Sequence, residues 1–461
     1  MTQTVMLPLP TLREPPRPPT RIGRKYYIRT FGCQMNEHDS ERVAGLFEMD
    51  GMSPADDLET ADVVYINTCT IRENADNRMY GNLGQLKAFK DVNPEMLLVV
   101  GGCAAQKDRD LVRQRAPWVD VVMGTHNLDR VIELMDHAEN WGPITEVVDE
   151  LQAMPSSLPS RRELRHSAWV TIQVGCNNTC TFCIVPSVRG VEVSRRPGDV
   201  VREVERLAAD GVVEITLLGQ NVDTYGRDLA LDGRRRPIFA ELLRRVGEVS
   251  GIRRVRFTSP HPNDFREDVA LAMAETEAVC EQLHFPLQSG SDRILRAMHR
   301  GYNRSKYMER LAMARETIPE LGVSTDVIVG FPGETDADFE QTLEVVEEAR
   351  FDAAFMFIFS PRPGTAAAEM TEAFVPDEVI KERFARLSSL QNRISGERNQ
   401  EMVGVSLEVL SEGASRKDAT MATTRTRSGK VVHVPGEHAQ GTFLDVEIET
   451  AHQHHLTGKV L

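Results

Sequence analysis

The amino-acid sequence predicts an α/β protein in three parts: an open parallel sheet, a partial six-unit α/β barrel and a small β-barrel. Three observations support this fold. Apolar strands alternate with helical stretches over residues 25–150, and a second series of the same kind runs over residues 168–400. The last stretch, 401–461, has short strands separated by glycine-containing turns. Strand–helix alternation predicts parallel sheets, whereas short strands with turns predict a β-barrel.

The first sheet is expected from four apolar segments that each lead into a helix or a turn. They are residues 25–33, 61–69, 95–103 and 119–125. The first three end in Cys33, Cys69 and Cys103. Neighbouring strands lie about 4.8 Å apart and open sheets bind ligands at their carboxyl edge, so these thiols are expected to surround one site. The alternative is that they only pack, as buried cysteines often do.

The second series predicts a barrel whose active site lies at the carboxyl ends of its strands. Its six apolar segments are 168–176, 212–221, 253–262, 281–290, 322–334 and 351–365. Gly219, Gln220 and Asn221 follow the second strand and could receive the amine of a small ligand. Ser289 precedes a helix whose amino end favours a carboxylate. Each signal alone is weak, because Gly and Ser also occur in ordinary turns.

The segments outside these two series predict the domain limits. Residues 1–24 include six prolines before residue 20 and predict a disordered leader rather than a signal peptide. Residues 151–167 are rich in Ser, Pro and Arg and predict a linker. A helix is expected over residues 376–402, before the C-terminal β-barrel.

The composition is that of an ordinary globular protein, with 41% hydrophobic and 27% charged residues among 461. No apolar run reaches the ~18 residues of a membrane span, so the expected location is cytoplasmic without membrane association. Seven cysteines, an odd number, argue against a disulfide framework. The net charge of −15 argues against nonspecific nucleic-acid binding over the whole surface. Arg189, Arg195 and Arg196 form one candidate basic patch, whose alternative is a solvated surface run.

The most informative motif is GCNNTCTFC, which places Cys176, Cys180 and Cys183 in a C-x3-C-x2-C spacing after the first barrel strand. Three thiolates on one short loop can hold three corners of a 4Fe–4S cube and leave one iron open for a substrate. A structural zinc site needs four ligands, usually from two C-x2-C pairs, and the sequence has no second pair. Bacterial ferredoxin spacing also differs. The motif therefore favours an open iron–sulfur cluster at the barrel mouth.

Two further groups of potential ligands are assigned other roles. Cys280 lies before the fourth barrel strand and is expected to pack in the core. His452, His454 and His455 could suggest a metal site, but an exposed polar tail is the favoured interpretation.

The cysteine loop resembles the radical S-adenosylmethionine (SAM) superfamily, and the chain beyond the leader resembles the methylthiotransferases of that superfamily. The similar segments occur in order: TFGCQMNEHDSE, INTCTIRENADNR, GGCAAQ, GCNNTCTFCIVPSVRGVEVSR, LLGQNVDTYG, FPLQSGSDRIL, DVIVGFPGET and FSPRPGTAA. Gln34 and Met35 resemble the branch that modifies N6-isopentenyladenosine in tRNA, because the ribosomal-protein branch tends to carry Pro-Lys there. The resemblance also implies that the C-terminal β-barrel is a TRAM domain.

The resemblance implies an enzyme that inserts a methylthio group at carbon 2 of N6-isopentenyladenosine at tRNA position 37. It implies two 4Fe–4S clusters: a radical cluster on Cys176, Cys180 and Cys183, and a second cluster on Cys33, Cys69 and Cys103. The first would bind and cleave SAM to a radical that takes hydrogen from carbon 2, and the second would deliver sulfur. The adenosine would have to leave the anticodon-loop stack.

Several further expectations follow from the same resemblance. Phe182 and Ile184 are expected to pack around the radical cluster and limit water. The expected partners are the anticodon stem–loop of tRNA and a small-protein electron donor, and the chain is expected to be a monomer. One alternative is the same chemistry on threonylcarbamoyl-adenosine in tRNA or on a ribosomal-protein aspartate. Another is an iron–sulfur protein that binds RNA without catalysis.

Overall fold

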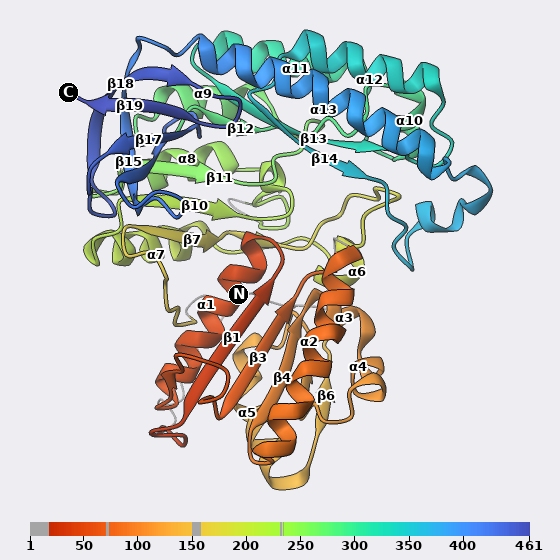
Figure 1. The fold of residues 1–461 in the computed structure, drawn as a ribbon, viewed down its shortest axis with the longest axis vertical. Coiled ribbons are helices and arrows are strands. Elements are labelled where there is room, and N and C mark those ends of the chain that lie inside the picture. The colour runs from red at the N-terminus through yellow and green to blue at the C-terminus, as the bar shows by residue number, and fades with distance from the viewer. Residues whose placement is uncertain (1–17, 71–72, 150–157, 231–232, 234) are drawn as a thin grey trace, which may run out of the picture.

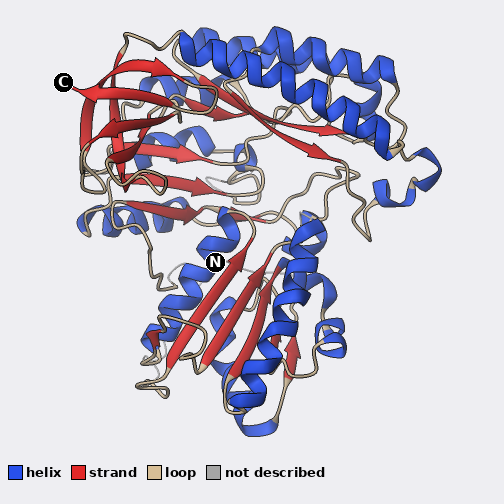
Figure 2. Ribbon diagram, in the orientation of Figure 1, coloured by secondary structure: helices blue, strands red, loops and turns tan. Residues whose placement is uncertain are grey.

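A computed structural model describes residues 18–70, 73–149, 158–230, 233 and 235–461. The chain forms three parts in the predicted order, and in the view of Figure 1 the C-terminal barrel lies at the left of the middle part and the N-terminal sheet lies below it. Figure 2 shows the strands of each part and the helices around them. The predicted α/β class and three-part architecture are confirmed. In the described part of the chain, no helix is long and apolar enough to cross a membrane.

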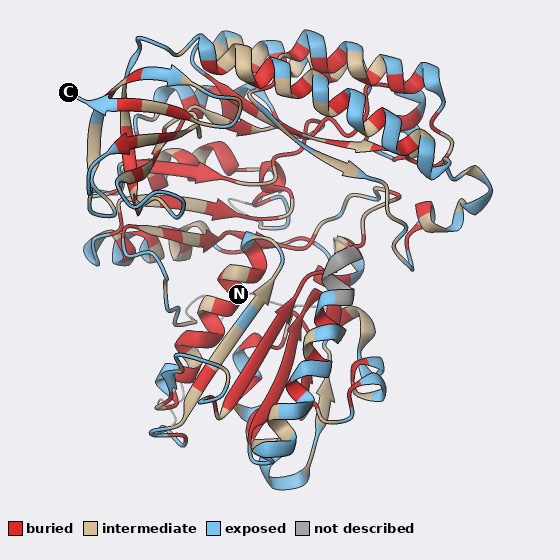
Figure 3. Ribbon diagram, in the orientation of Figure 1, coloured by how far each residue is buried: buried red, intermediate tan, exposed pale blue. Residues whose placement is uncertain are grey.

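The N-terminal part is a parallel sheet with the strand order β2-β1-β3-β4-β5-β6. Its elements are β1 (Lys25–Phe31), α1 (Gln34–Met49), β2 (Ser53–Pro54), β3 (Val63–Thr68), α2 (Glu73–Val92), β4 (Leu97–Gly102), α3 (Cys103–Asp108), α4 (Asp110–Arg115), β5 (Val121–Met123), α5 (Val131–Trp141) and β6 (Ile144–Glu146). Strands β3 and β4 are buried at every position (Figure 3). Their continuous apolar sequences suit parallel strands that are covered on both faces.

Residues just before β1 already pack against the end of α1 and against α5. Arg21 is buried and forms ion pairs with Asp50 at 2.8 Å and Asp136 at 2.9 Å. The end of the predicted leader is therefore held by charge pairing. Residues 1–17, the rest of that leader, and residues 150–157, the first half of the predicted linker, lie outside the described residues.

The middle part is an open barrel of six parallel strands in two sheets, β11-β10-β7 and β12-β13-β14. Its elements are β7 (Ser167–Thr171), β8 (Gln173–Val174), α6 (Val185–Arg189), β9 (Val193–Ser194), α7 (Pro197–Ala209), β10 (Glu214–Leu218), α8 (Phe239–Gly247), β11 (Arg254–Phe257), α9 (Glu267–Glu275), β12 (Gln282–His284), α10 (Asp292–Ala297), α11 (Arg304–Thr317), β13 (Gly322–Val329), α12 (Asp336–Ala349), β14 (Ala353–Ile358) and α13 (Asp377–Gln400). An isolated parallel bridge between Val255 and Val279 connects the two sheets. The barrel stays open between its edge strands β7 and β14.

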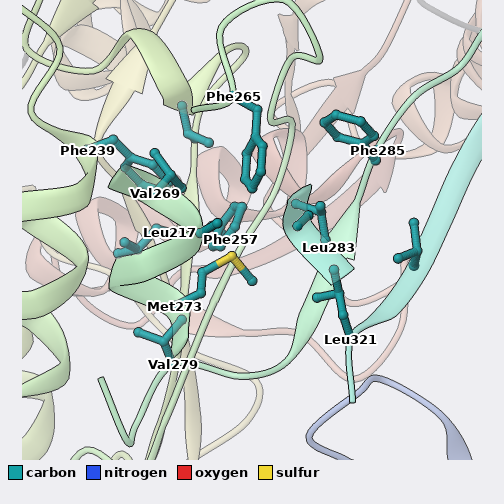
Figure 4. Packing of buried hydrophobic residues seen from close by; sticks show 14 of the residues in the cluster. Leu217, Phe239, Phe257, Phe265, Val269, Met273, Val279, Leu283, Phe285 and Leu321 are labelled. Atoms are coloured by element: carbon teal, nitrogen blue, oxygen red, sulfur yellow. The ribbon is translucent and has the colours of Figure 1, made fainter. Parts of the chain in front are cut away.

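The barrel core forms where the strands meet the helices around them, and Figure 4 shows side chains of β10, α8, β11, α9 and β12 converging there. The rings of Phe239 and Phe257 meet edge to face at 5.2 Å, and those of Phe265 and Phe285 at 5.5 Å. Such aromatic pairs add to the burial of apolar area. This packing fixes the strands and therefore the positions of the loops at their carboxyl ends.

The C-terminal part is a closed barrel in the order β15-β16-β17-β19-β18. Its strands are β15 (Ser406–Ala414), β16 (Met421–Thr426), β17 (Val431–Pro435), β18 (Phe443–Ala451) and β19 (Leu456–Val460). Two buried arginines of β11 attach it to the middle part. Arg254 donates to the carbonyl oxygen of Arg425 at 2.7 Å. Arg256 donates to the carbonyl oxygens of Thr426 and Arg427, both at 2.8 Å.

Replacing Arg256 with leucine is expected to destabilise the protein. Arg256 also pairs with Glu214 at 2.9 Å, so the variant leaves a largely buried carboxylate, 12% exposed, and two carbonyls without this donor. We expect a loss of about 3–5 kcal/mol in urea denaturation followed by circular dichroism. As a control, Arg244→Leu breaks only the exposed pair with Glu275 and should lose about 0–1 kcal/mol. Equal losses in the two variants would contradict this role of Arg256.

Candidate active site

The three N-terminal cysteines meet at the carboxyl edge of the first sheet. Cys33 precedes α1 just after β1, Cys69 follows β3, and Cys103 begins α3 after β4. Strand β3 lies between β1 and β4, so the three loops are neighbours. The strand order reverses between β1 and β3, which is where open α/β sheets build their ligand crevice. The predicted placement of these thiols at one edge is therefore observed.

Two glycines allow the cysteine loops to come this close. A Cβ on Gly32 would lie 2.7 Å from the Cβ of Cys69, and a Cβ on Gly102 would lie 2.2 Å from Oδ1 of Asn67. Gly102 also has a φ of 89°, a backbone conformation that favours glycine. Any side chain at either position would push the loops apart.

Asn36, in the first turn of α1, lies between the thiols. Its Oδ1 accepts a hydrogen bond from Cys33 Sγ at 3.5 Å and lies 4.0 Å from Cys103 Sγ. Its Nδ2 donates to Oδ1 of Asn67 at 2.9 Å, and Asn67 donates back to the carbonyl oxygen of Asn36 at 2.7 Å. The paired amides are buried, so they hold the Asn36 oxygen toward the thiols.

The thiols of this group differ in acidity. A hydrogen bond with Cys69 lowers the pKa of Cys33 to about 6; burial opposes the shift and the positive charge of Arg189 supports it. Burial raises the pKa of Cys103, and Arg189 opposes that rise. The thiolate is the form that binds metals. Cys33 is therefore mostly a thiolate at neutral pH.

The second cysteine group lies on the loop between β8 and α6. Main-chain hydrogen bonds hold this loop: Cys183 N donates to the oxygen of Cys180 at 3.0 Å, and Cys176 N to that of Gly190 at 3.1 Å. Arg300 Nη1 donates to Cys180 Sγ at 3.3 Å. Burial raises the pKa of Cys176 to about 12 and that of Cys183 to about 11.

The predicted packing residues Phe182 and Ile184 belong to this loop, and each packs against a different neighbour. Phe182 meets Phe331 edge to face at 6.5 Å. Ile184 is buried and forms one apolar cluster with Val188 and with Cys103 of the N-terminal group. The loop that carries the second cysteine group therefore packs directly on the first group.

Each cysteine group supplies three thiols, the number that leaves one iron of a 4Fe–4S cube open. Among the described residues, no three His, Cys, Asp or Glu side chains come close enough to hold one metal ion. All seven cysteines are free of disulfides, so each group of three has its sulfur atoms available.

One cavity of about 1060 Å³ connects the two cysteine groups. Cys33 and Cys69 line it from the N-terminal sheet, and Cys183 lines it from the barrel loop. The cavity follows residues of β13 and β14 and reaches the C-terminal barrel, where Lys430 and His455 line it. Sites that the sequence places in separate domains thus face one space.

The predicted SAM residues after β10 include unpaired acceptors. Oε1 of Gln220 and Oδ1 of Asn221 are buried and accept no hydrogen bond from any described residue. Oε1 of Gln173 is also buried and accepts no hydrogen bond from any described residue. A Cβ built on Gly219 would lie 3.6 Å from the Cβ of Gln173, so the two residues are neighbours. Buried acceptors of this kind need donors, and the amine and hydroxyl groups of SAM would supply them. The residues present therefore fit this cofactor.

Ser289, the fourth predicted SAM residue, is buried, and its Oγ lies 3.4 Å from that of Thr342. Ser289 does not line the cavity, but its neighbour Gln288 and the more distant Ser259 do. Both have a positive φ, 67° at Gln288 and 57° at Ser259. Such backbone strain in residues other than glycine is concentrated at functional sites. The sequence gives no signal for it, and the role of Ser289 stays a prediction.

The predicted basic patch is not a surface patch. Arg189 and Arg195 are buried, and of the three arginines only Arg196 is exposed. Arg189 pairs with Asp39 at 2.7 Å, and Arg195 pairs with Glu203 at 2.6 Å. The interpretation as a solvated run is therefore wrong for two of them, because their partners come from α1 and α7.

The C-terminal histidines belong to the loop between β18 and β19 and are not a tail. The rings of His452 and His455 stack at 4.4 Å, and His433 approaches His455 at 5.1 Å. His454 and His455 line the cavity.

Cys280 is buried, in agreement with its predicted packing role.

Comparison with known proteins supports the division into parts. A family model described as "Radical SAM superfamily" matches residues 170–346, and one described as "Uncharacterized protein family UPF0004" matches residues 25–124. The solved structure of TsrM, a radical SAM methyltransferase from Kitasatospora setae, has a TM-score of 0.55 and 14% identity, covering 75% of this chain and 74% of that chain. That likeness concerns the fold. Together with the cysteine loop, these findings define a radical SAM protein.

Curated relatives define the family more narrowly. The tRNA-2-methylthio-N(6)-dimethylallyladenosine synthase of Parafrankia sp. (strain EAN1pec) is 54% identical over 447 residues, which cover 94% of this chain and 90% of the relative. The protein of the same name from Thermobifida fusca (strain YX) is 53% identical, covering 94% and 88%. The chain belongs to this family of methylthiotransferases.

The acidity of Cys33 predicts a pH-dependent difference in alkylation of the cluster-free protein. Since the thiolate reacts, modification of Cys33 by iodoacetamide should rise through its pKa of about 6 and level off above it. Modification of Cys176, with a pKa of about 12, should keep rising through the alkaline range. Peptide mass spectrometry after short exposures measures both sites in one sample. A Cys33 profile centred at an ordinary thiol pKa of about 8.5 would contradict the assignment.

Proposed function

We propose that this protein is a radical SAM tRNA methylthiotransferase that inserts a methylthio group at carbon 2 of N6-isopentenyladenosine at position 37, next to the anticodon. The observation that carries the proposal is the shared cavity of about 1060 Å³, lined by cysteines of both groups and extending to the C-terminal barrel. Hydrogen removal and sulfur delivery must act on one carbon, so both cysteine groups have to reach the same substrate.

The two cysteine groups would hold the two clusters, one on Cys176, Cys180 and Cys183 and the other on Cys33, Cys69 and Cys103. When bound, the clusters and SAM supply one-electron cleavage, hydrogen abstraction and sulfur transfer. Gln220 and Asn221 would orient SAM through their unpaired acceptors. Phe182 and Ile184 would keep water from the space between the clusters.

An apolar wall of the cavity favours the isopentenyl substrate over its alternatives. Phe355 on β14 is 55% exposed, lines the cavity and meets the ring of His284 at 5.8 Å. Phe357 lies two residues further along the strand and also lines the cavity. Asp326, opposite Phe355 on β13, adds a carboxylate. A threonylcarbamoyl group or an aspartate would bring a second carboxylate there and lose its hydration, whereas an isopentenyl chain would bury apolar surface.

The C-terminal barrel would bind the anticodon stem–loop. Arg425, Lys430 and His455 line the cavity from this side. Arg425 pairs with Glu412 and Lys430 with Asp352, so contacts with phosphate would have to replace these carboxylates. A small-protein electron donor, a monomeric state and a cytoplasmic location complete the proposal.

The variant Cys33→Ala is expected to separate the two half-reactions. It removes one ligand of the second cluster and leaves the radical-cluster loop intact, so reductive cleavage of SAM should continue while methylthiolation of isopentenylated tRNA is lost. Nucleoside mass spectrometry and detection of deoxyadenosine measure the two outcomes. Cys280→Ala serves as the control and should retain both. Methylthiolated tRNA from the Cys33 variant would overturn the assignment of the second cluster.

The apolar wall predicts substrate choice. Phe355→Asp should reduce methylthiolation of isopentenylated tRNA at least tenfold, because an added carboxylate would have to lose water beside an apolar chain, a cost of about 1–3 kcal/mol or more. Phe355→Leu should retain most activity. Turnover of anticodon stem–loops that carry isopentenyl- or threonylcarbamoyl-adenosine measures the preference. Equal use of both by the unaltered protein would contradict the isopentenyl assignment.

A further inference from the structure

We propose that Arg189 is a positioning residue that places a fixed positive charge at the N-terminal cysteine group and thereby raises the reduction potential of the second cluster. Arg189 belongs to α6, which directly follows the radical-cluster loop, so the middle part of the chain completes a site in the N-terminal part. This inference rests on the proposed cluster at Cys33, Cys69 and Cys103.

The contacts of Arg189 place its guanidinium among the ligand thiols. Its Nη2 donates to Oδ1 of Asn36 at 3.4 Å. The same oxygen accepts from Cys33 Sγ at 3.5 Å and lies 4.0 Å from Cys103 Sγ. The positive charge of the guanidinium also opposes the rise that burial causes in the pKa of Cys103. Asn36 and Arg189 therefore form a polar contact surface around these sulfur atoms.

Burial makes this charge effective. The side chains of Arg189 and Asp39 are only 4% and 5% exposed, so water screens their charges little. Asp39 pairs with Nη2 of Arg189 at 2.7 Å and compensates the cost of burying the guanidinium. At Cys103 the attraction of Arg189 outweighs the repulsion of Asp39. At this thiol the arginine therefore has the larger effect of the two charges.

Packing between the two halves fixes the arginine in place. Ile184 and Val188, on the same short segment, pack on Cys103. Thr125, after β5 of the N-terminal sheet, donates from Oγ1 to the carbonyl oxygen of Val188 at 2.7 Å. These contacts fix the backbone of α6 beside the thiols, and the ion pair with Asp39 holds the Arg189 side chain there.

The expected effect follows from charge. A cube held by three thiolates becomes more negative when it gains an electron, so a nearby positive charge favours the reduced form. Net charge and hydrogen bonds to sulfur are known to set cluster potentials. Removing Arg189 should lower the potential, and removing Asp39 should raise it. A purely structural role would not produce shifts of opposite sign.

The test uses the full-length chain with Cys176, Cys180 and Cys183 replaced by alanine, so that only the second cluster is reconstituted. Redox titration followed by electron paramagnetic resonance measures its potential. We expect Arg189→Met to disfavour reduction about tenfold, which is about 59 mV for one electron. Asp39→Asn should shift the potential upward, and Arg189→Lys should stay close to the parent. The control Arg195→Met, which removes another buried arginine between α7 and β7, should leave the potential unchanged.

The outcomes separate this inference from the proposed function. A parent chain that fails to hold about four irons overturns the second cluster itself. If the parent holds them, an unchanged potential in Arg189→Met, or an equal shift in Arg195→Met, overturns the role of Arg189. If Arg189→Met loses its iron, Asp39→Asn decides, because an unchanged or lowered potential in that variant overturns the proposal.

Discussion

The packing of α6 between the N-terminal sheet and the barrel brings the two cysteine groups to one cavity. Ile184 and Val188 cover Cys103, and Arg189 enters the buried charge network of α1. These contacts join the carboxyl edges of two sheets, where parallel strands build their ligand sites. Without them, each half would still have its own cysteine loop, but the two loops would not share a substrate.

Local sequence pattern was sufficient for the architecture and for the cysteines. Strands such as β3 and β4 are continuous apolar runs, and each is followed by a cysteine that the parallel topology must place at the carboxyl edge. The six barrel strands follow one another along the sequence as predicted, and only the first of them leads into a cysteine loop. The closed C-terminal barrel followed from short strands and glycine turns. The reason is physical: periodicity and strand direction depend on residues that are close in sequence.

The remainder of the site depends on contacts between distant segments and was not predictable. Arg189 looked like part of a surface run, yet its partner Asp39 lies 150 positions earlier, on α1. The strained backbone at Ser259 and Gln288 has no signature in side-chain type. The C-terminal histidines looked like a tail because His433, whose ring meets that of His455 edge to face, belongs to another strand. In each case the feature is determined by tertiary packing between segments that are distant in sequence.

The arginines of β11 have a mechanical consequence. Arg254 and Arg256 bind main-chain carbonyls of the C-terminal barrel and so hold that barrel near the amino end of β11. The loop with Cys176, Cys180 and Cys183 lies at the opposite, carboxyl end of the barrel strands. An RNA bound to the C-terminal barrel would be held at a constant distance from the reacting sulfur. The enzyme would then select a nucleotide by the distance of that nucleotide from the stem as well as by the chemistry of its base.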